Sequence, residues 1–210
     1  CKASGIPEEK ISVVPNGIDL SEYLTLPPRG SFKKKYGIPK NKKIILFLGR
    51  INRFKGIDFL IEAFAYMINN AKNDVKHDVL LVIAGPDDGY LSETKKLVRR
   101  YKIKNHVLFT GPLFGMKKIE AYVDALIVTS LDSLREVVFL LVPLEAAACG
   151  TPVIVTKENY ISELVKKGEF GFVVRYGDVL GLVNLFREIL NKRDLLEKMG
   201  LKGRDFIFKN

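Results

Sequence analysis

The stretch KIILFLGRINRFKGIDFLIEAFAYMINN, residues 43–70, decides the fold. After Lys43 it begins with an unbroken apolar run that leads into a glycine, a pattern typical of a buried strand. Residues 58–70 have the length and composition of a helix. The loop between them carries Gly49 and Gly56 at its two ends. A buried strand, a short glycine loop and a helix form the first half of a βαβ unit.

The same alternation runs to the end of the chain. We expect strands at 43–48, 79–84, 107–110, 125–129, 152–155 and 171–174. Helices are expected at 58–70, 91–102, 117–123, 143–149, 161–167 and 179–191, with a last one from Asp194 onward. Because crossovers between parallel strands are right-handed, this series predicts an α/β fold with one open, doubly wound, mostly parallel sheet of about six strands and helices on both faces. Ligands of such sheets bind at the carboxyl ends of the strands.

The composition excludes several classes of protein. With 210 residues, 47% of them hydrophobic, the chain has enough apolar surface for a core, which excludes intrinsic disorder. Its longest apolar runs fall short of the roughly 18–20 residues of a membrane span. Two cysteines and two histidines exclude a disulfide scaffold and a Cys/His zinc cluster. We expect a cytoplasmic protein that acts in solution or at the cytoplasmic face of a membrane.

Residues 1–40 differ from the rest of the chain. They are rich in turn formers and carry the basic run Lys33-Lys34-Lys35. We expect 1–40 to be an interdomain linker with an entry helix, and 41–210 to be the folded domain. Because the chain begins with Cys1 in place of Met, we also expect it to be a fragment from which a further domain is absent.

The loop after the first strand is the strongest candidate site. Arg50, Arg53 and Lys55 place positive charge beside the start of a helix, and Gly49 and Gly56 permit close approach of the backbone. This combination suits a phosphate or a diphosphate. Its spacing is neither that of a Walker loop nor that of the three-glycine dinucleotide motif. A basic surface turn is the alternative.

Two further loops end expected strands. Asp87 and Asp88 offer two carboxylates, which are either metal ligands or, as we favour, ordinary turn residues before a helix. The segment Thr-Gly-Pro-Leu at 110–113 either brings backbone groups against a flat base or is only a turn.

Two glutamates flank the apolar run 137–144. Glu145 is expected to open an alanine-rich helix, where its carboxylate either accepts hydrogen bonds from paired sugar hydroxyls or only favours the helix dipole. Glu136 precedes the run. Cys149 lies among small residues and is interpreted as a buried filler rather than a nucleophile. His77 and His106 are assigned no role.

Five ordered segments resemble the C-terminal half of retaining GT-B glycosyltransferases, the group that includes sucrose, trehalose and glycogen synthases. The segments are Val14-Pro15-Asn16-Gly17-Ile18-Asp19, Gly49-Arg50 with Lys55-Gly56, Val107-Leu108-Phe109-Thr110-Gly111, Val142-Pro143-Leu144-Glu145-Ala146 and Cys149-Gly150-Thr151-Pro152-Val153-Ile154. The resemblance extends over essentially the whole chain. It implies a Rossmann-like donor-binding domain of the glycosyltransferase group 1, or family 4, type, whose N-terminal acceptor domain is absent from this chain.

The resemblance also implies roles for individual residues. Arg50 and Lys55 match the cations that bind the donor diphosphate and stabilise it as it leaves, in place of a metal. Glu145 matches the acid that holds the ribose hydroxyls, and backbone groups of 110–113 match those that meet the base. The implied donor-binding set is Gly49, Arg50, Lys55, Thr110, Gly111, Leu113, Leu141, Val142 and Glu145, and the implied catalytic set is Arg50, Lys55 and Glu136.

The partners implied by the resemblance are a UDP-, GDP- or ADP-sugar as donor and a glycan, lipid-linked or small-molecule acceptor. No cofactor, metal or nucleic acid is expected. The formal charge of +10 is also compatible with peripheral association with a membrane. Without the acceptor domain, the chain by itself is expected to be inactive.

One segment departs from the family pattern. An acid usually stands eight positions before the helix glutamate, followed by Gly-Phe-Gly-Leu; here Val137 takes that position, Glu136 is one place earlier, and Val138-Phe139-Leu140-Leu141 follow. Either a bulge returns Glu136 to the site, or the donor pocket is altered or defective. Two other functions stay open: a sugar-nucleotide epimerase, which shares the fold, and a basic Rossmann-like module that binds nucleic acid.

Overall fold

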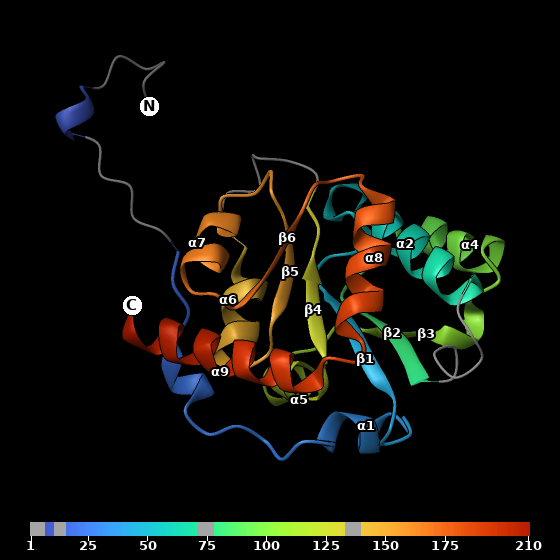
Figure 1. The fold of residues 1–210 in the computed structure, drawn as a ribbon, viewed down its shortest axis with the longest axis horizontal. Helices are drawn as coiled ribbons and strands as arrows, with labels where there is room; N and C mark the ends of the chain where they lie inside the picture. Colours follow the sequence, from blue (N-terminus) through green and yellow to red (C-terminus); the bar gives the residue numbers. More distant parts are fainter. Residues whose placement is uncertain (1–6, 11–15, 71–77, 133–139) are drawn as a thin grey trace.

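The structure is a computed structural model that describes residues 7–10, 16–70, 78–132 and 140–210. At its centre is a six-stranded sheet in the order β3-β2-β1-β4-β5-β6, in which every neighbouring pair is parallel (Figure 1). The strands are β1 (Lys43–Leu48), β2 (Val79–Ala84), β3 (Val107–Gly111), β4 (Ile127–Ser130), β5 (Val153–Thr156) and β6 (Gly171–Val174). The prediction of a doubly wound α/β sheet of six strands is confirmed, and the sheet is wholly parallel.

The strand order reverses direction at β1. Successive strands build outward through β2 and β3, and the chain then returns to pair β4 on the other side of β1. Such a reversal opens a crevice at the carboxyl ends of the two strands beside it, and ligands of open α/β sheets bind there. The fold therefore directs attention to the loops that follow β1 and β4.

Helices cover both faces of the sheet (Figure 1). One face is packed mainly by α2 (Ile57–Asn69), α4 (Leu91–Arg100) and α8 (Val179–Ile189). The other face carries α1 (Ser31–Lys35), α5 (Met116–Asp124), α6 (Leu141–Ala148), α7 (Ile161–Lys167) and much of α9 (Arg193–Lys209). The described short 3-10 helices are η2 (Glu8–Lys10), η3 (Leu20–Tyr23), η4 (Arg53–Lys55) and η5 (Lys104–His106).

Strand β1 shows why its sequence is a continuous apolar run. Ile45 and Phe47 point into the core under α2, whereas Ile44 and Leu46 point into the core under α5 and α6. All four are at most 2% exposed. A strand buried on both faces needs apolar residues at every position, because alternate side chains enter opposite cores.

The segment before β1 packs onto the second core. Tyr23 and Phe32 are fully buried there, and the Phe32 ring lies 4.5 Å from that of Tyr36. Arg204 of α9 donates hydrogen bonds to the carbonyl oxygens of Tyr23, at 2.8 Å, and of Leu24, at 3.3 Å. The entering segment and the last helix are therefore joined directly.

Element boundaries differ from expectation in two places that matter for the site. Strand β4 begins at Ile127 rather than at 125, because the backbone N–H of Ala125 still donates to the end of α5. Helix α6 begins at Leu141 rather than at 143. Pro143 is tolerated within the first turn, where its missing N–H would have no partner inside the helix. Glu145 is therefore the fifth residue of α6 and not its opening residue.

In the part of the chain that the structure describes, no helix is both long and apolar enough to cross a bilayer.

The close approach of Gly85 to Gly49 yields a stability prediction. A Cβ at Gly85, whose φ is +153°, would lie 1.7 Å from the carbonyl oxygen of Gly49. We expect Gly85→Ala to lower the free energy of unfolding by about 3 kcal/mol, measured by urea denaturation. Gly89→Ala is the matched control, because Gly89 has a φ of +82° but open space around it, and should cost only about 1 kcal/mol. Equal losses in the two variants would contradict the packing argument.

Candidate functional site

Backbone contacts join the loops after β1, β2 and β3 into one edge. The N–H of Gly49 donates to Ala84 O at 3.0 Å, and the N–H of Gly85 donates to Gly111 O at 2.9 Å. Ile51 and Asp87 extend the pairing of β1 and β2 by a parallel bridge. The expected site residues Gly49 and Gly111 therefore lie on the same edge of the sheet, separated by Gly85.

The loop between β1 and α2 is pressed against the end of β4. The Asn52 side chain accepts a hydrogen bond from the Phe54 N–H at 3.1 Å and so caps η4. Gly56 follows with a φ of +62°, and a Cβ there would lie 2.0 Å from Leu131 O. Only glycine fits at this position. This contact places Lys55 beside the residue that follows Leu131.

Lys55 forms an ion pair with Asp132. Its Nζ lies 2.5 Å from Asp132 Oδ1, and the two side chains are 16% and 2% exposed. Asp132 is held in place from both sides: Ser130 Oγ donates to its Oδ2 at 3.2 Å, and Thr156 Oγ1 donates to its backbone oxygen at 2.8 Å. Lys55 was expected from the sequence, whereas Asp132 was not. The signal was available, since Asp132 lies two residues after a strand at the point where the strand order reverses.

Arg50 lies at the same edge and is open to solvent. Its side chain is 67% exposed, and NH1 lies 3.1 Å from Asp88 Oδ2, which also accepts from Asn52 Nδ2 at 2.9 Å. The neighbouring Asp87 accepts hydrogen bonds at Oδ1 from the backbone N–H groups of residues 89, 90 and 91. The turn interpretation of this loop is confirmed for Asp87, whereas Asp88 orients Arg50. Within the described ranges, no group of three or more His, Cys, Asp or Glu side chains could hold a metal.

The end of β3 forms a tight turn. Gly111 has a φ of +73°, and Thr110 Oγ1 donates to the carbonyl oxygen of Gly111 at 2.9 Å. The Leu113 side chain is only 7% exposed and belongs to the second core, so any contact of Leu113 with a ligand would come from its backbone. Phe114 and Met116, which the sequence analysis did not single out, are 75% and 54% exposed.

Glu145 lies in a polar cluster between α5 and α6. Its Oε1 accepts from Lys118 Nζ at 2.7 Å and its Oε2 from the Tyr122 hydroxyl at 2.7 Å. Burial and the Glu145 charge raise the pKa of Tyr122, and the same two causes raise the pKa of Tyr23. Both phenols therefore stay protonated near neutral pH. Glu145 bonds to these partners, whereas Lys55 bonds to Asp132, so the two expected site residues belong to separate clusters.

The start of α6 supplies the remaining predicted residues. Leu141 is the first residue of the helix and is 37% exposed, and Val142 packs against the second core. Leu140 is 7% exposed. Glu136 lies outside the described residues, as do Val137, Val138, Phe139 and His77.

Comparison with known proteins identifies the family of this chain. The sequence model described as "Glycosyl transferases group 1" matches residues 28–206. The chain belongs to this family. Of its curated relatives, the N-acetyl-alpha-D-glucosaminyl L-malate synthase of Bacillus anthracis is 29% identical over 203 residues, which cover 97% of this chain and 50% of that protein. The chain spans about half the length of the curated relatives it matches.

Several solved structures share the fold. HepE of Anabaena, solved in complex with UDP-glucose, matches with a TM-score of 0.84 and 23% identity, covering 99% of this chain and 55% of that one. The C-terminal domain of a group 1 family protein (LpcC) from Francisella tularensis matches with a TM-score of 0.78 and 23% identity, covering 92% of this chain and 98% of that one. The chain is therefore a C-terminal-type domain of the GT-B fold.

The Cys149 thiol is buried, as expected of a side chain that fills space in the core, and its reactivity can be measured. It is 6% exposed, and burial raises its pKa to about 12. In a Cys1→Ser variant at pH 8, we expect a thiol reagent to modify the folded chain on the order of a thousandfold more slowly than the urea-unfolded chain. Rapid labelling of the folded chain, followed by absorbance, would contradict this environment.

The Lys55–Asp132 pair is testable by a double substitution. Lys55→Met leaves the buried Asp132 carboxylate without a counter-ion, and we expect the free energy of unfolding to fall by about 3 kcal/mol. Lys55→Met combined with Asp132→Asn removes both charges and should recover most of that loss. Urea denaturation of the two variants measures the difference. An equal loss of stability in the single and the double variant would mean that the Lys55–Asp132 ion pair does not stabilise this edge of the sheet.

Proposed function

We propose that this chain is the donor-binding half of a retaining glycosyltransferase that transfers a sugar from a nucleoside diphosphate sugar to an acceptor. The observation that carries the proposal is the placement of Arg50 and Lys55 on one short loop at the carboxyl edge of the sheet, in a chain of the group 1 family. Family membership favours glycosyl transfer, and the position of the two cations favours a diphosphate ligand.

Arg50 is the cation proposed to meet the diphosphate first. Its guanidinium is largely exposed and presents several N–H donors in a planar fork, which matches phosphate oxygens. Asp88, which also accepts a hydrogen bond from Asn52, holds it at the edge of the crevice. When the bond between the sugar and the diphosphate breaks, negative charge develops on the leaving oxygen, and a fixed cation beside it stabilises the transition state.

Lys55 is proposed to contribute without leaving Asp132. An ammonium group has three N–H donors, and Asp132 Oδ1 takes one of them. The carboxylate therefore fixes the direction of the lysine and leaves donors for a phosphate oxygen. Both cations are paired with a carboxylate, but Arg50 is far more exposed than Lys55, so we assign the larger share of diphosphate affinity to Arg50.

Glu145 is proposed to accept hydrogen bonds from the ribose hydroxyls. Each carboxylate oxygen can accept about two hydrogen bonds. Lys118 donates to Oε1 and Tyr122 to Oε2, and the Tyr23 hydroxyl also interacts with this carboxylate. These partners hold the carboxylate in one orientation, and its remaining acceptor capacity is proposed to serve the ribose hydroxyls. The backbone of 110–113 is proposed to meet the base.

The proposed reaction needs no nucleophile from the protein. The acceptor oxygen attacks the anomeric carbon on the face from which the diphosphate leaves, its proton passes to a phosphate oxygen, and the configuration is retained. Because side-chain cations stabilise the leaving group, we propose that the reaction is independent of metal. Acceptor binding belongs to a part of the enzyme outside this chain.

Calorimetric titration with UDP, GDP and ADP in buffer containing EDTA tests the proposal. We expect one nucleotide to bind, and Arg50→Ala to weaken that binding about tenfold to a hundredfold through loss of charge-assisted hydrogen bonds. Arg100→Ala, at the exposed end of α4, is the control and should leave the affinity unchanged. Nucleotide binding that depends strictly on magnesium would contradict the proposal that side-chain cations replace a metal. Sugar transfer by this chain alone would contradict its assignment as one half of the enzyme.

A further inference from the structure

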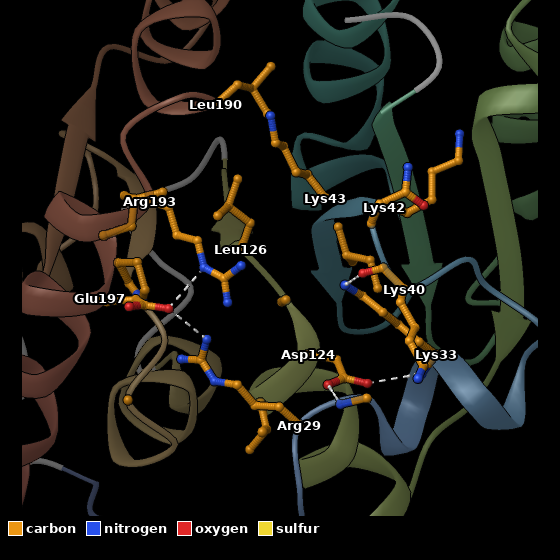
Figure 2. Close-up of a pocket in the computed structure, with 18 residues that line it drawn as sticks. Arg29, Lys33, Lys40, Lys42, Lys43, Asp124, Leu126, Leu190, Arg193 and Glu197 are labelled. Atoms are coloured by element: carbon orange, nitrogen blue, oxygen red, sulfur yellow. Dashed lines mark hydrogen bonds and ion pairs between the residues drawn. The ribbon is translucent and has the colours of Figure 1, made fainter. Parts of the chain in front are cut away.

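The described residues form a second concave site at the opposite edge of the sheet from Arg50 and Lys55. A pocket of about 410 Å³ lies beside the amino ends of β1, β4 and β5, between the segment that precedes β1 and the start of α9 (Figure 2). Its apolar wall includes Ile44, Leu126, Pro152, Leu190 and Leu196. None of the described residues assigned to the donor site lines it.

The pocket is strongly cationic. Its ionisable lining residues are Arg29, Lys33, Lys40, Lys42, Lys43 and Arg193 on the positive side and Asp124 and Glu197 on the negative side. Six cations against two carboxylates leave a formal excess of four positive charges. Five of the six cations come from residues 29–43, before and at the start of β1, and the fold adds Arg193 from the start of α9.

Both carboxylates are already engaged within the protein. Asp124 accepts hydrogen bonds from the backbone N–H groups of Gly30 and Lys33. Glu197 Oε1 accepts from Arg29 NH1 and from Arg193 Nε, each at 3.0 Å (Figure 2). One carboxylate therefore serves two guanidinium groups, and the other is used to fix the backbone. The excess of positive charge remains.

Lys33 is a partly buried cation of the pocket. Its side chain is directed toward the Lys40 carbonyl oxygen, to which Nζ donates at 3.1 Å (Figure 2). Burial lowers its pKa, Arg193 and Arg29 lower it further, and the Asp124 charge opposes them. Lys43 Nζ donates to a neutral partner, Asn191 Oδ1, at 3.2 Å. The ammonium groups of Lys33 and Lys43 thus bond to neutral oxygens in a cation-rich hollow, an arrangement that a bound anion would stabilise.

We propose that this pocket binds a phosphate group of a ligand that carries at least two negative charges. Lysine ammonium groups with three donors each, together with arginine forks, match phosphate oxygens, and the apolar wall accommodates the part of the ligand that carries the phosphate. A soluble phosphorylated molecule and a phospholipid headgroup share this chemistry. The site is separate from the donor diphosphate site and extends beyond the proposed function.

The test uses inorganic pyrophosphate as probe. The background is Arg50→Ala, which weakens diphosphate binding at the other edge. On this background, calorimetry at low salt should show binding of pyrophosphate. The double substitution Lys40→Gln with Lys43→Gln should weaken this binding at least tenfold, and added salt should reduce it. Lys104→Gln with Lys167→Gln removes the same number of charges elsewhere on the surface and should change the affinity less than twofold.

A second arm distinguishes the two sources of phosphate. Sedimentation with vesicles of phosphatidylcholine and phosphatidylglycerol, compared with vesicles of phosphatidylcholine alone, shows whether a lipid headgroup is taken. If vesicle binding is lost in the Lys40/Lys43 variant but not in the Lys104/Lys167 variant, the pocket binds the phosphate of a lipid headgroup. If the pocket binds pyrophosphate but not vesicles, its ligand is a soluble phosphorylated molecule.

Two results would overturn the proposal. One is the absence of binding to both pyrophosphate and anionic vesicles. The other is equal weakening in the two double variants, which would assign binding to general surface charge. Because the substituted lysines are partly or wholly exposed, thermal melts should show that all variants fold. Either negative result leaves the nucleotide titration at the other edge unaffected.

Discussion

Burial of β1 on both faces, with hydrogen bonds along both edges, is the constraint on which the rest of the structure depends. β2 pairs with the whole of β1, and β4 pairs with its residues 45–47. A shift of one residue in this register would send the side chains of Ile45 and Phe47 into the opposite core. The register also determines where the chain leaves the sheet, and so it places Arg50 and Lys55 beside the ends of β2 and β4.

Much of the fold could be predicted from local sequence. The strands Lys43–Leu48, Val79–Ala84 and Gly171–Val174 begin and end as expected. The first two are apolar runs that lie inside the sheet, and the third, an edge strand, is a short apolar run that begins with glycine. The start of α6 was misplaced, since Pro143 suggested a helix boundary where the helix in fact contains the proline in its first turn. That error moved Glu145 from the second turn to the first.

The candidate site was harder to predict because its contacts are not local. Lys55 and Asp132 are 77 positions apart, and their pairing follows from the approach of Gly56 to Leu131. Charge and loop position identified Arg50, Arg53 and Lys55, and the family resemblance selected Arg50 and Lys55 among them. The pairing of these two with Asp88 and Asp132 was not predicted. The basic pocket was only partly visible in the sequence: its cations at 29–43 stand close together along the chain, whereas Arg193 and the carboxylates of Asp124 and Glu197 join them only in the folded chain.

The contacts of Arg204 have a mechanical consequence. This one guanidinium donates to the backbone oxygens of Ala148, Tyr23 and Leu24, and so it joins α9 both to the end of α6 and to the segment that enters before β1. A force that pulls the segment before β1 away from α9 would act on these hydrogen bonds, and on the packing of the buried Tyr23 ring, before it acted on any strand. These hydrogen bonds therefore connect the two flanks of the domain without passing through a strand of the sheet.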